Sequence, residues 1–226
     1  MAVIKHIAIK NARYIDVVNY LEYQHNELTN KPIRDENGRL IEREGYVIGG
    51  VNCTPESFPR ACEELNEKYE KNNSKEEIKA HHYILSFDPR DREDNGLTVE
   101  RAQQLGIEFC NNHFPGHQAI VCTHPDGHNG AGNIHVHIVI NSIRMEDVER
   151  KPYMDRASDS LAGFKPYHLA GVFAPMACYQ FIGSVLQRPY NSRHKNADAL
   201  YALCDHLHLL IIPHLERMIL EWDKLF

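Results

Sequence analysis

The stretch Gly132-Asn133-Ile134-His135-Val136-His137-Ile138-Val139-Ile140-Asn141 has the alternation of side chains that is typical of a β-strand. Side chains at positions i and i+2 of a strand point to the same face, so His135 and His137 share one face. The alternating isoleucines and valine share the other face. The stretch therefore predicts a sheet with an apolar core on one side and polar chemistry on the other.

Similar patterns predict the remaining elements of this half of the chain. Strands are expected at residues 3–9, 80–87 and 118–123, in addition to 134–142. Helices are expected at residues 14–25, 54–72 and 98–113, and a polar turn or hairpin excursion at 29–45. This succession predicts an α+β fold in which helices flank a mainly antiparallel sheet.

The pattern changes beyond about Asp147. Residues 150–175 are irregular, whereas 176–186 and 197–226 look helical, with a break at Pro213. We expect a core at residues 1–147 and a mostly helical portion at 148–226 that packs on the core or completes the same domain.

Composition narrows the class of protein. With 226 residues, 42% of them hydrophobic, the chain can bury a substantial core. No apolar run approaches the roughly 18–20 residues of a membrane-spanning helix, and the first residues lack the succession of a signal peptide. We therefore expect a cytoplasmic protein without membrane contact. The six cysteines form no Cys-x-x-Cys pair, which disfavours a zinc ribbon or a disulfide framework.

The net charge of −6 argues against broad, sequence-independent binding to nucleic acid, which normally depends on Lys and Arg. Binding depends on the local potential, however, and basic residues can cluster in an acidic chain. The charge therefore restricts a nucleic-acid site to a defined part of the surface.

A third histidine joins the pair on the strand. A lone histidine is more often a packing residue than a ligand. Here His124 ends the preceding expected strand, and a hairpin connection would bring it beside His135 and His137. Three neutral imidazoles leave coordination positions for substrate, as a catalytic metal requires. His128 is an alternative third ligand, and Asp126 could orient a ligating imidazole.

The segments around these histidines resemble, in their order along the chain, the relaxases of mobile genetic elements. These enzymes belong to the histidine-hydrophobe-histidine (HUH) endonuclease superfamily. The resemblance covers roughly residues 1–145 and implies the HUH relaxase fold with a helical C-terminal extension. The similar segments are Tyr20-Leu21, Gly49-Gly50-Val51-Asn52-Cys53, His82-Tyr83-Ile84-Leu85-Ser86-Phe87, residues 98–114, Thr123-His124-Pro125-Asp126 and the stretch from His135 to Asn141.

The resemblance implies an activity. In this family a tyrosine hydroxyl attacks a phosphodiester of single-stranded DNA at the transfer origin, which leaves a 5′-phosphotyrosine and a free 3′-hydroxyl, and the step can be reversed to re-ligate the strand. The motif implies Tyr20 as the nucleophile, with Tyr23 as the alternative because the two are three residues apart. A divalent ion on His124, His135 and His137 would polarise the phosphate, and a carboxylate such as Asp126 or water would take the phenol proton.

Other residues are candidates for DNA contact. His82 and Ser86 are two of them and are expected on the same strand face. The resemblance implies that Ser86 binds phosphate, and the alternative is a strand hydroxyl that is hydrogen-bonded within the protein. Asn141 lies on the face of the two strand histidines, where it either contacts DNA or ends the strand.

The resemblance also implies a divalent cofactor and partners. We expect Mn²⁺ or Mg²⁺ ahead of Zn²⁺, Ni²⁺ or Co²⁺, although imidazoles suit several of these ions. The expected partners are single-stranded or hairpin origin-of-transfer DNA, a relaxosome accessory protein and a coupling protein. Two alternatives stay open: a rolling-circle replication initiator or transposase of the same superfamily, and a non-catalytic nucleic-acid-binding module stabilised by a structural metal with four protein ligands.

Overall fold

The structure is a computed structural model, and it describes residues 3–10, 13–26, 29, 31–126, 132–151, 154 and 156–165. The chain divides into two compact units, Met1–Leu186 and Gln187–Phe226, and every described residue belongs to the first. The helices expected at 176–186 and 197–226, like His128, lie outside the described residues.

Five antiparallel strands form one sheet with the order β1-β3-β5-β4-β2. β5 lies between two other strands and is buried along its whole length, so its polar residues as well as its apolar ones lie in the interior. The strands are β1 (Val3–Ile9), β2 (Val47–Val51), β3 (Ala80–Ser86), β4 (His117–His124) and β5 (His135–Arg144).

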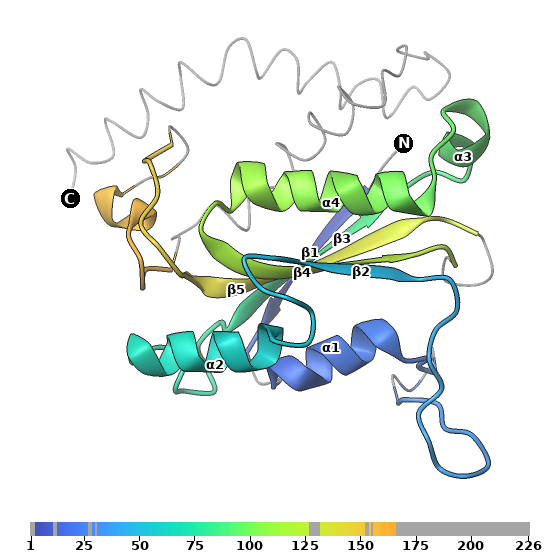
Figure 1. The fold of residues 1–226 in the computed structure, drawn as a ribbon, viewed down its shortest axis with the longest axis horizontal. Coiled ribbons are helices and arrows are strands. Elements are labelled where there is room, and N and C mark those ends of the chain that lie inside the picture. Colours follow the sequence, from blue (N-terminus) through green and yellow to red (C-terminus); the bar gives the residue numbers. More distant parts are fainter. Residues whose placement is uncertain are drawn as a thin grey trace. The chain divides into compact units, whose positions relative to one another are not determined.

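Helices cover both faces of the sheet. α4 (Val99–His113) lies on one face, and α1 (Tyr14–Glu22) and α2 (Phe58–Lys68) lie on the other (Figure 1). A short helix, α3 (Arg90–Asp94), connects β3 to α4. The α+β fold predicted from the sequence, an antiparallel sheet flanked by helices, is confirmed.

Each face of β5 has its own neighbours. Val136, Ile138 and Ile140 belong to the core under α4, together with Leu105 and Phe109 of that helix. The core under α1 and α2 is separate and includes Val139 of β5. The alternation in the sequence thus places Val136, Ile138 and Ile140 under α4, and it places His135 and His137, like Val139, on the side of α1 and α2.

The sequence pattern did not predict one strand, β2. β2 contains Gly49-Gly50, and glycine weakens the pattern by which a strand is recognised. A Cβ at Gly50 would lie 2.0 Å from the carbonyl oxygen of Cys53, so only glycine allows the chain to turn back at this point. The weak strand signal is therefore the result of a close backbone approach.

The expected helix at 14–25 is shorter in the structure, and the prediction that Tyr20 and Tyr23 share it is wrong. α1 ends at Glu22, and Tyr23 is extended, with its backbone bridged to Glu42. Pairing continues as Gln24 donates its N–H to the carbonyl of Ile41. The returning chain thus competes successfully for backbone groups that a longer helix would have used.

Smaller differences occur elsewhere. The helix expected at 54–72 is confined to α2, the loop after β3 contains α3, and β5 continues to Arg144. Among the described residues after 147 there is a short 3₁₀ helix, Ala157–Ser160. Arg144, which is 2% exposed, donates to the carbonyl oxygens of Asp159 and Pro115. Residues around 159 therefore pack on the core, while a domain boundary at 147 stays a prediction.

In the part of the chain that the structure describes, no helix combines the length and apolar character needed to cross a bilayer.

The packing of α4 on the sheet gives a first testable prediction. A Cβ at Gly106 would lie 2.6 Å from Val121 and 2.7 Å from Val136, so Gly106→Ala must push α4 away from the sheet. Alanine normally favours a helix by about 1 kcal/mol relative to glycine. We expect the opposite sign here, a decrease of about 1–3 kcal/mol in the free energy of unfolding, measured by urea denaturation.

The matched control is Gln104→Ala, at an exposed position of the same helix, which should change the free energy of unfolding by less than about 0.5 kcal/mol. A stabilising Gly106→Ala would show that α4 does not lie as close to the sheet as described.

Candidate metal centre

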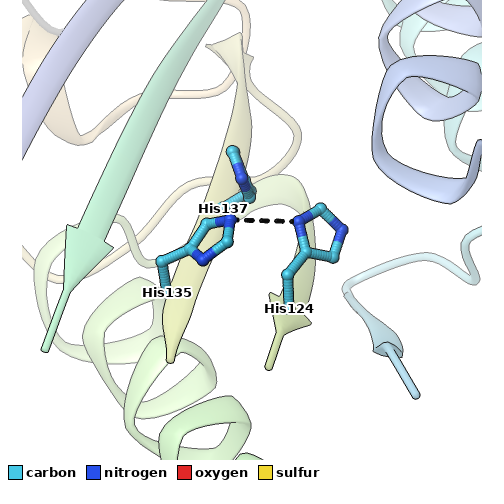
Figure 2. A group of neighbouring side chains, drawn as sticks. All are labelled: His124, His135 and His137. Carbon is cyan, nitrogen blue, oxygen red and sulfur yellow. Dashed lines mark hydrogen bonds between the residues drawn. The ribbon is translucent and has the colours of Figure 1, made fainter. Parts of the chain in front are cut away.

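The pairing of β4 with β5 brings three histidines together. His124 ends β4 and lies directly opposite His135, the first residue of β5, and His137 follows on the same face. Their ligand nitrogens all lie within 4.8 Å of one another, and the side chains converge as Figure 2 shows. All three residues are buried, with exposed fractions of 1%, 7% and 3%.

Backbone carbonyls orient two of the rings. His124 Nε2 lies 2.8 Å from the carbonyl oxygen of Leu21, and His135 Nδ1 lies 3.2 Å from that of Asn133. A carbonyl oxygen can only accept, so each of these nitrogens carries the proton. The unprotonated nitrogens, His124 Nδ1 and His135 Nε2, therefore face the centre of the cluster.

A fourth histidine holds the third ring. His82 Nε2 lies 2.9 Å from Nδ1 of His137, which leaves Nε2 of His137 as its ligand atom. Burial lowers the pKa of His82 to about 4, and burial together with the neighbouring histidines lowers the pKa of His137 well below its usual value. Both rings are therefore neutral near pH 7, which is the form that binds metal.

The spacing of the nitrogens fits a metal ion. His124 Nδ1 and His135 Nε2 are 3.3 Å apart (Figure 2). Two ligands at 2.0–2.1 Å from a tetrahedral ion are separated by about 3.4 Å. Because both nitrogens present lone pairs to each other, a cation between them removes a repulsion. The set of three fixed, neutral imidazoles thus suits a divalent ion, and among the described residues it contains three protein ligands.

Of the two candidate nucleophiles, the structure brings Tyr20 to the cluster. The ring of Tyr20 lies 6.1 Å from that of His137 and 6.4 Å from that of His82, measured between centroids. Tyr20 is half-buried in the last turn of α1, next to Leu21. Tyr23 lies beyond the end of the helix, in the extended segment that pairs with Glu42.

Asp126, considered for the orientation of a ligating imidazole, lies at the surface beside Arg43. Its carboxylate is 62% exposed and lies 3.9 Å from Nη1 of Arg43. The ligating imidazoles are instead oriented by Leu21, Asn133 and His82.

The expected DNA-contacting residues lie in different environments. Ser86 is half-buried at the end of β3 and pairs in register with His135, beside the cluster. Asn141 is fully buried, and its side chain is bonded to Tyr14 Oη and to Gln118. His82, 6% exposed, is bonded to His137. These placements leave Ser86 as a DNA-contact candidate and favour structural and orienting roles for Asn141 and His82.

Sequence reasoning missed three residues near the cluster. His25 packs its ring 5.1 Å from that of Tyr20, Tyr46 lies 6.4 Å from His124, and Arg43 pairs loosely with Asp126. All belong to the segment that leaves α1 and returns to β2. No periodic signal marks them, because their positions depend on how this excursion folds back on the end of the helix.

Metal binding gives the second prediction. Mn²⁺ at a hundredfold excess over its dissociation constant should raise the melting temperature by about 5–10 °C, because ligand binding to the folded state alone stabilises it by about 2.7 kcal/mol. Mg²⁺ should have a smaller effect, since imidazole favours the transition metals. Differential scanning fluorimetry after dialysis against a chelator measures both.

His135→Ala should abolish most of the Mn²⁺-dependent shift. His6→Ala is the matched control, a half-buried histidine on β1 that is bonded to His81, and it should retain the shift. An equal shift in both variants would place the ion elsewhere.

Comparison with known proteins agrees with this geometry. The family model described as "Relaxase: MobA/VirD2-like, nuclease domain" matches residues 23–159, which include the three histidines. Two Staphylococcus aureus proteins named rlx are each 35% identical over 105 residues, or 46% of this chain. Escherichia coli TraI is 27% identical over 160 residues, or 70% of this chain.

The matched part is a fraction of these relatives. It covers 30% and 28% of the two rlx proteins and 19% of TraI. The family model, by contrast, matches more than half of the chain. The chain therefore belongs to the MobA/VirD2-like relaxase nuclease-domain family.

Proposed function

We propose that this protein is a metal-dependent relaxase that nicks single-stranded DNA at the transfer origin of a conjugative or mobilisable element. The observation that carries the proposal is the position of Tyr20, whose ring lies 6.1 Å from the ring of His137 within the histidine cluster. A hydroxyl nucleophile and a site able to hold a phosphate-polarising ion are the two parts that such a reaction requires.

The reaction is a transesterification. Tyr20 Oη attacks the phosphorus, the Tyr–O–P bond forms as the P–O3′ bond breaks, and the 3′ oxygen leaves as a hydroxyl after taking a proton. An ion held by His124, His135 and His137 would supply Lewis-acid polarisation of a phosphate oxygen. The phosphotyrosine retains one ester bond for the one that broke, so attack by the 3′-hydroxyl re-ligates the strand.

Ser86 would bind a phosphate oxygen at the edge of this centre, because its position opposite His135 brings a hydroxyl donor next to the cluster. The segment before β2 would cover the histidine cluster at His124, since Tyr46 packs against that residue.

Two residues are candidates to accept the phenol proton. Asp126 is the carboxylate expected at the site. His25 is the second, because its Nδ1 lies 2.8 Å from the carbonyl oxygen of Tyr23 and therefore carries the proton, which leaves a lone pair on Nε2. Its ring is in contact with that of Tyr20. An imidazole is suited to take the proton during cleavage and return it during re-ligation.

Origin DNA, an accessory protein and a coupling protein would be the partners, and the bacterial cytoplasm the place of action. Mn²⁺ is the ion that we favour over Mg²⁺, because the ligand set consists of imidazoles.

The nucleophile is tested by Tyr20→Phe, with Tyr23→Phe as the matched control. A pool of single strands with a randomised centre is incubated with wild-type protein and Mn²⁺, and the adducts that resist denaturation but not protease are recovered and sequenced. On the recovered oligonucleotide, Tyr20→Phe should reduce adduct formation by about a thousandfold or more while binding stays intact. Tyr23→Phe should form the adduct at the wild-type rate.

Peptide mass mapping of the wild-type adduct gives the linked residue directly. An adduct on Tyr23, or one that persists in Tyr20→Phe, would reject the assignment. His135→Ala should lose the adduct without rescue by added Mn²⁺ or Mg²⁺.

The proton acceptor is tested by comparing His25→Gln with Asp126→Asn in single-turnover cleavage across pH. The variant that removes the acceptor should slow cleavage by about 100-fold or more near neutral pH. For His25→Ala, added imidazole should restore part of the rate. If both variants cleave at the wild-type rate, water accepts the proton.

A further inference from the structure

Arg43 has an unusual environment for a charged residue. Its side chain is 18% exposed, and Nε is buried without a hydrogen-bond partner. The nearest ion pair, from Nη1 to Oδ2 of Asp126, spans 3.9 Å, which is longer than a hydrogen bond. The guanidinium thus has a buried Nε–H donor for which the described residues supply no acceptor.

This arrangement is energetically unfavourable for the protein alone. A buried N–H donor without an acceptor loses its hydrogen bond to water, and Asp126 compensates little because its carboxylate is 62% exposed and screened by solvent. Buried polar groups are nearly always satisfied, so the unsatisfied Nε of Arg43 is a donor that remains available to a ligand.

The backbone fixes Arg43 beside the metal centre. Its N–H donates to the carbonyl oxygen of Glu22 at 2.9 Å, one residue after the carbonyl of Leu21 that holds His124. Gly45, two residues after Arg43, lies against Pro125, the residue that follows His124. A Cβ at Gly45 would be 3.4 Å from Cγ of Pro125.

We propose that Arg43 binds a phosphate of the single-stranded DNA, next to the phosphate that Tyr20 attacks. This inference rests on the proposed function, because it takes the DNA strand as the substrate of the histidine cluster. The planar guanidinium presents paired donors that match two phosphate oxygens, and a phosphodiester would supply both the charge and the acceptors that Arg43 lacks.

Carboxylates near Arg43 restrict where a DNA backbone can bind. Glu22 lies close by, and its pKa is raised by burial and by the carboxylates of Glu42 and Glu56. These acidic groups repel a DNA backbone that lies across the surface at random. Arg43 then acts as one defined phosphate position in a chain with a net charge of −6.

The test uses Arg43→Met in the full chain with Tyr20→Phe present, so that no strand is cleaved. Affinity for a fluorescent single-stranded DNA pool of randomised sequence is measured by anisotropy over a range of salt. We expect affinity to fall roughly tenfold or more and the slope of log K against log salt to decrease by about 0.7, which corresponds to one phosphate contact. Inorganic phosphate should compete weakly compared with the oligonucleotide.

Arg39→Met is the matched control. Arg39 is an exposed arginine of the same excursion, so the substitution changes net charge equally. Its slope and affinity should stay at the values of the Tyr20→Phe parent. Equal behaviour of the two arginine variants would overturn the proposal.

Thermal unfolding without DNA separates ligand binding from a structural role. Removing an unsatisfied buried charge should raise the melting temperature of Arg43→Met or leave it unchanged. A lower melting temperature together with weaker DNA binding would overturn the proposal. The nucleophile assignment is read from adduct formation by the Tyr20 and Tyr23 variants, so failure of either inference is distinguishable from failure of the other.

Discussion

The hydrogen bond from His124 Nε2 to the carbonyl oxygen of Leu21 connects the histidine cluster to α1, the helix that carries Tyr20. It fixes which nitrogen of His124 faces the cluster, and it satisfies a carbonyl in the last turn of α1 that has no partner within the helix. The next carbonyl, that of Glu22, accepts from Arg43. The end of α1 therefore positions a ligating imidazole, the neighbouring Tyr20 and the guanidinium through adjacent residues.

This arrangement also has an electrostatic consequence. The C-terminal end of a helix carries partial negative charge on its carbonyls, which favours cations nearby. α1 ends at the histidine cluster and at Arg43, so the helix compensates some of the positive charge that a divalent ion would bring. The protein can thus concentrate positive charge at one place although its overall charge is negative.

The sequence predicted the parts of the structure that depend on periodic patterns. The two faces of β5 follow from alternation, and α4 follows from helical spacing that begins after Thr98, whose side chain caps the helix. It predicted the three clustered histidines for the same reason. It did not predict β2, because the glycine that a close backbone approach requires also removes the strand signal. The end of α1 was misplaced because pairing with a segment about 20 residues away determines it. His25, Arg43 and Tyr46 depend on that pairing, so no local pattern could have found them.

The opposition of His124 and His135 across two paired strands has a consequence for how such proteins vary. Strand pairing, and not the length of the connection between the strands, holds the two imidazoles together. Insertions in that connection leave the ligands in place, whereas a shift of one strand by one residue against the other would turn the histidines of the shifted strand to the opposite face. Relatives can therefore diverge widely in the number of residues between their ligands while their strands stay constant in length, and a search based on fixed histidine spacing would overlook members that share this geometry.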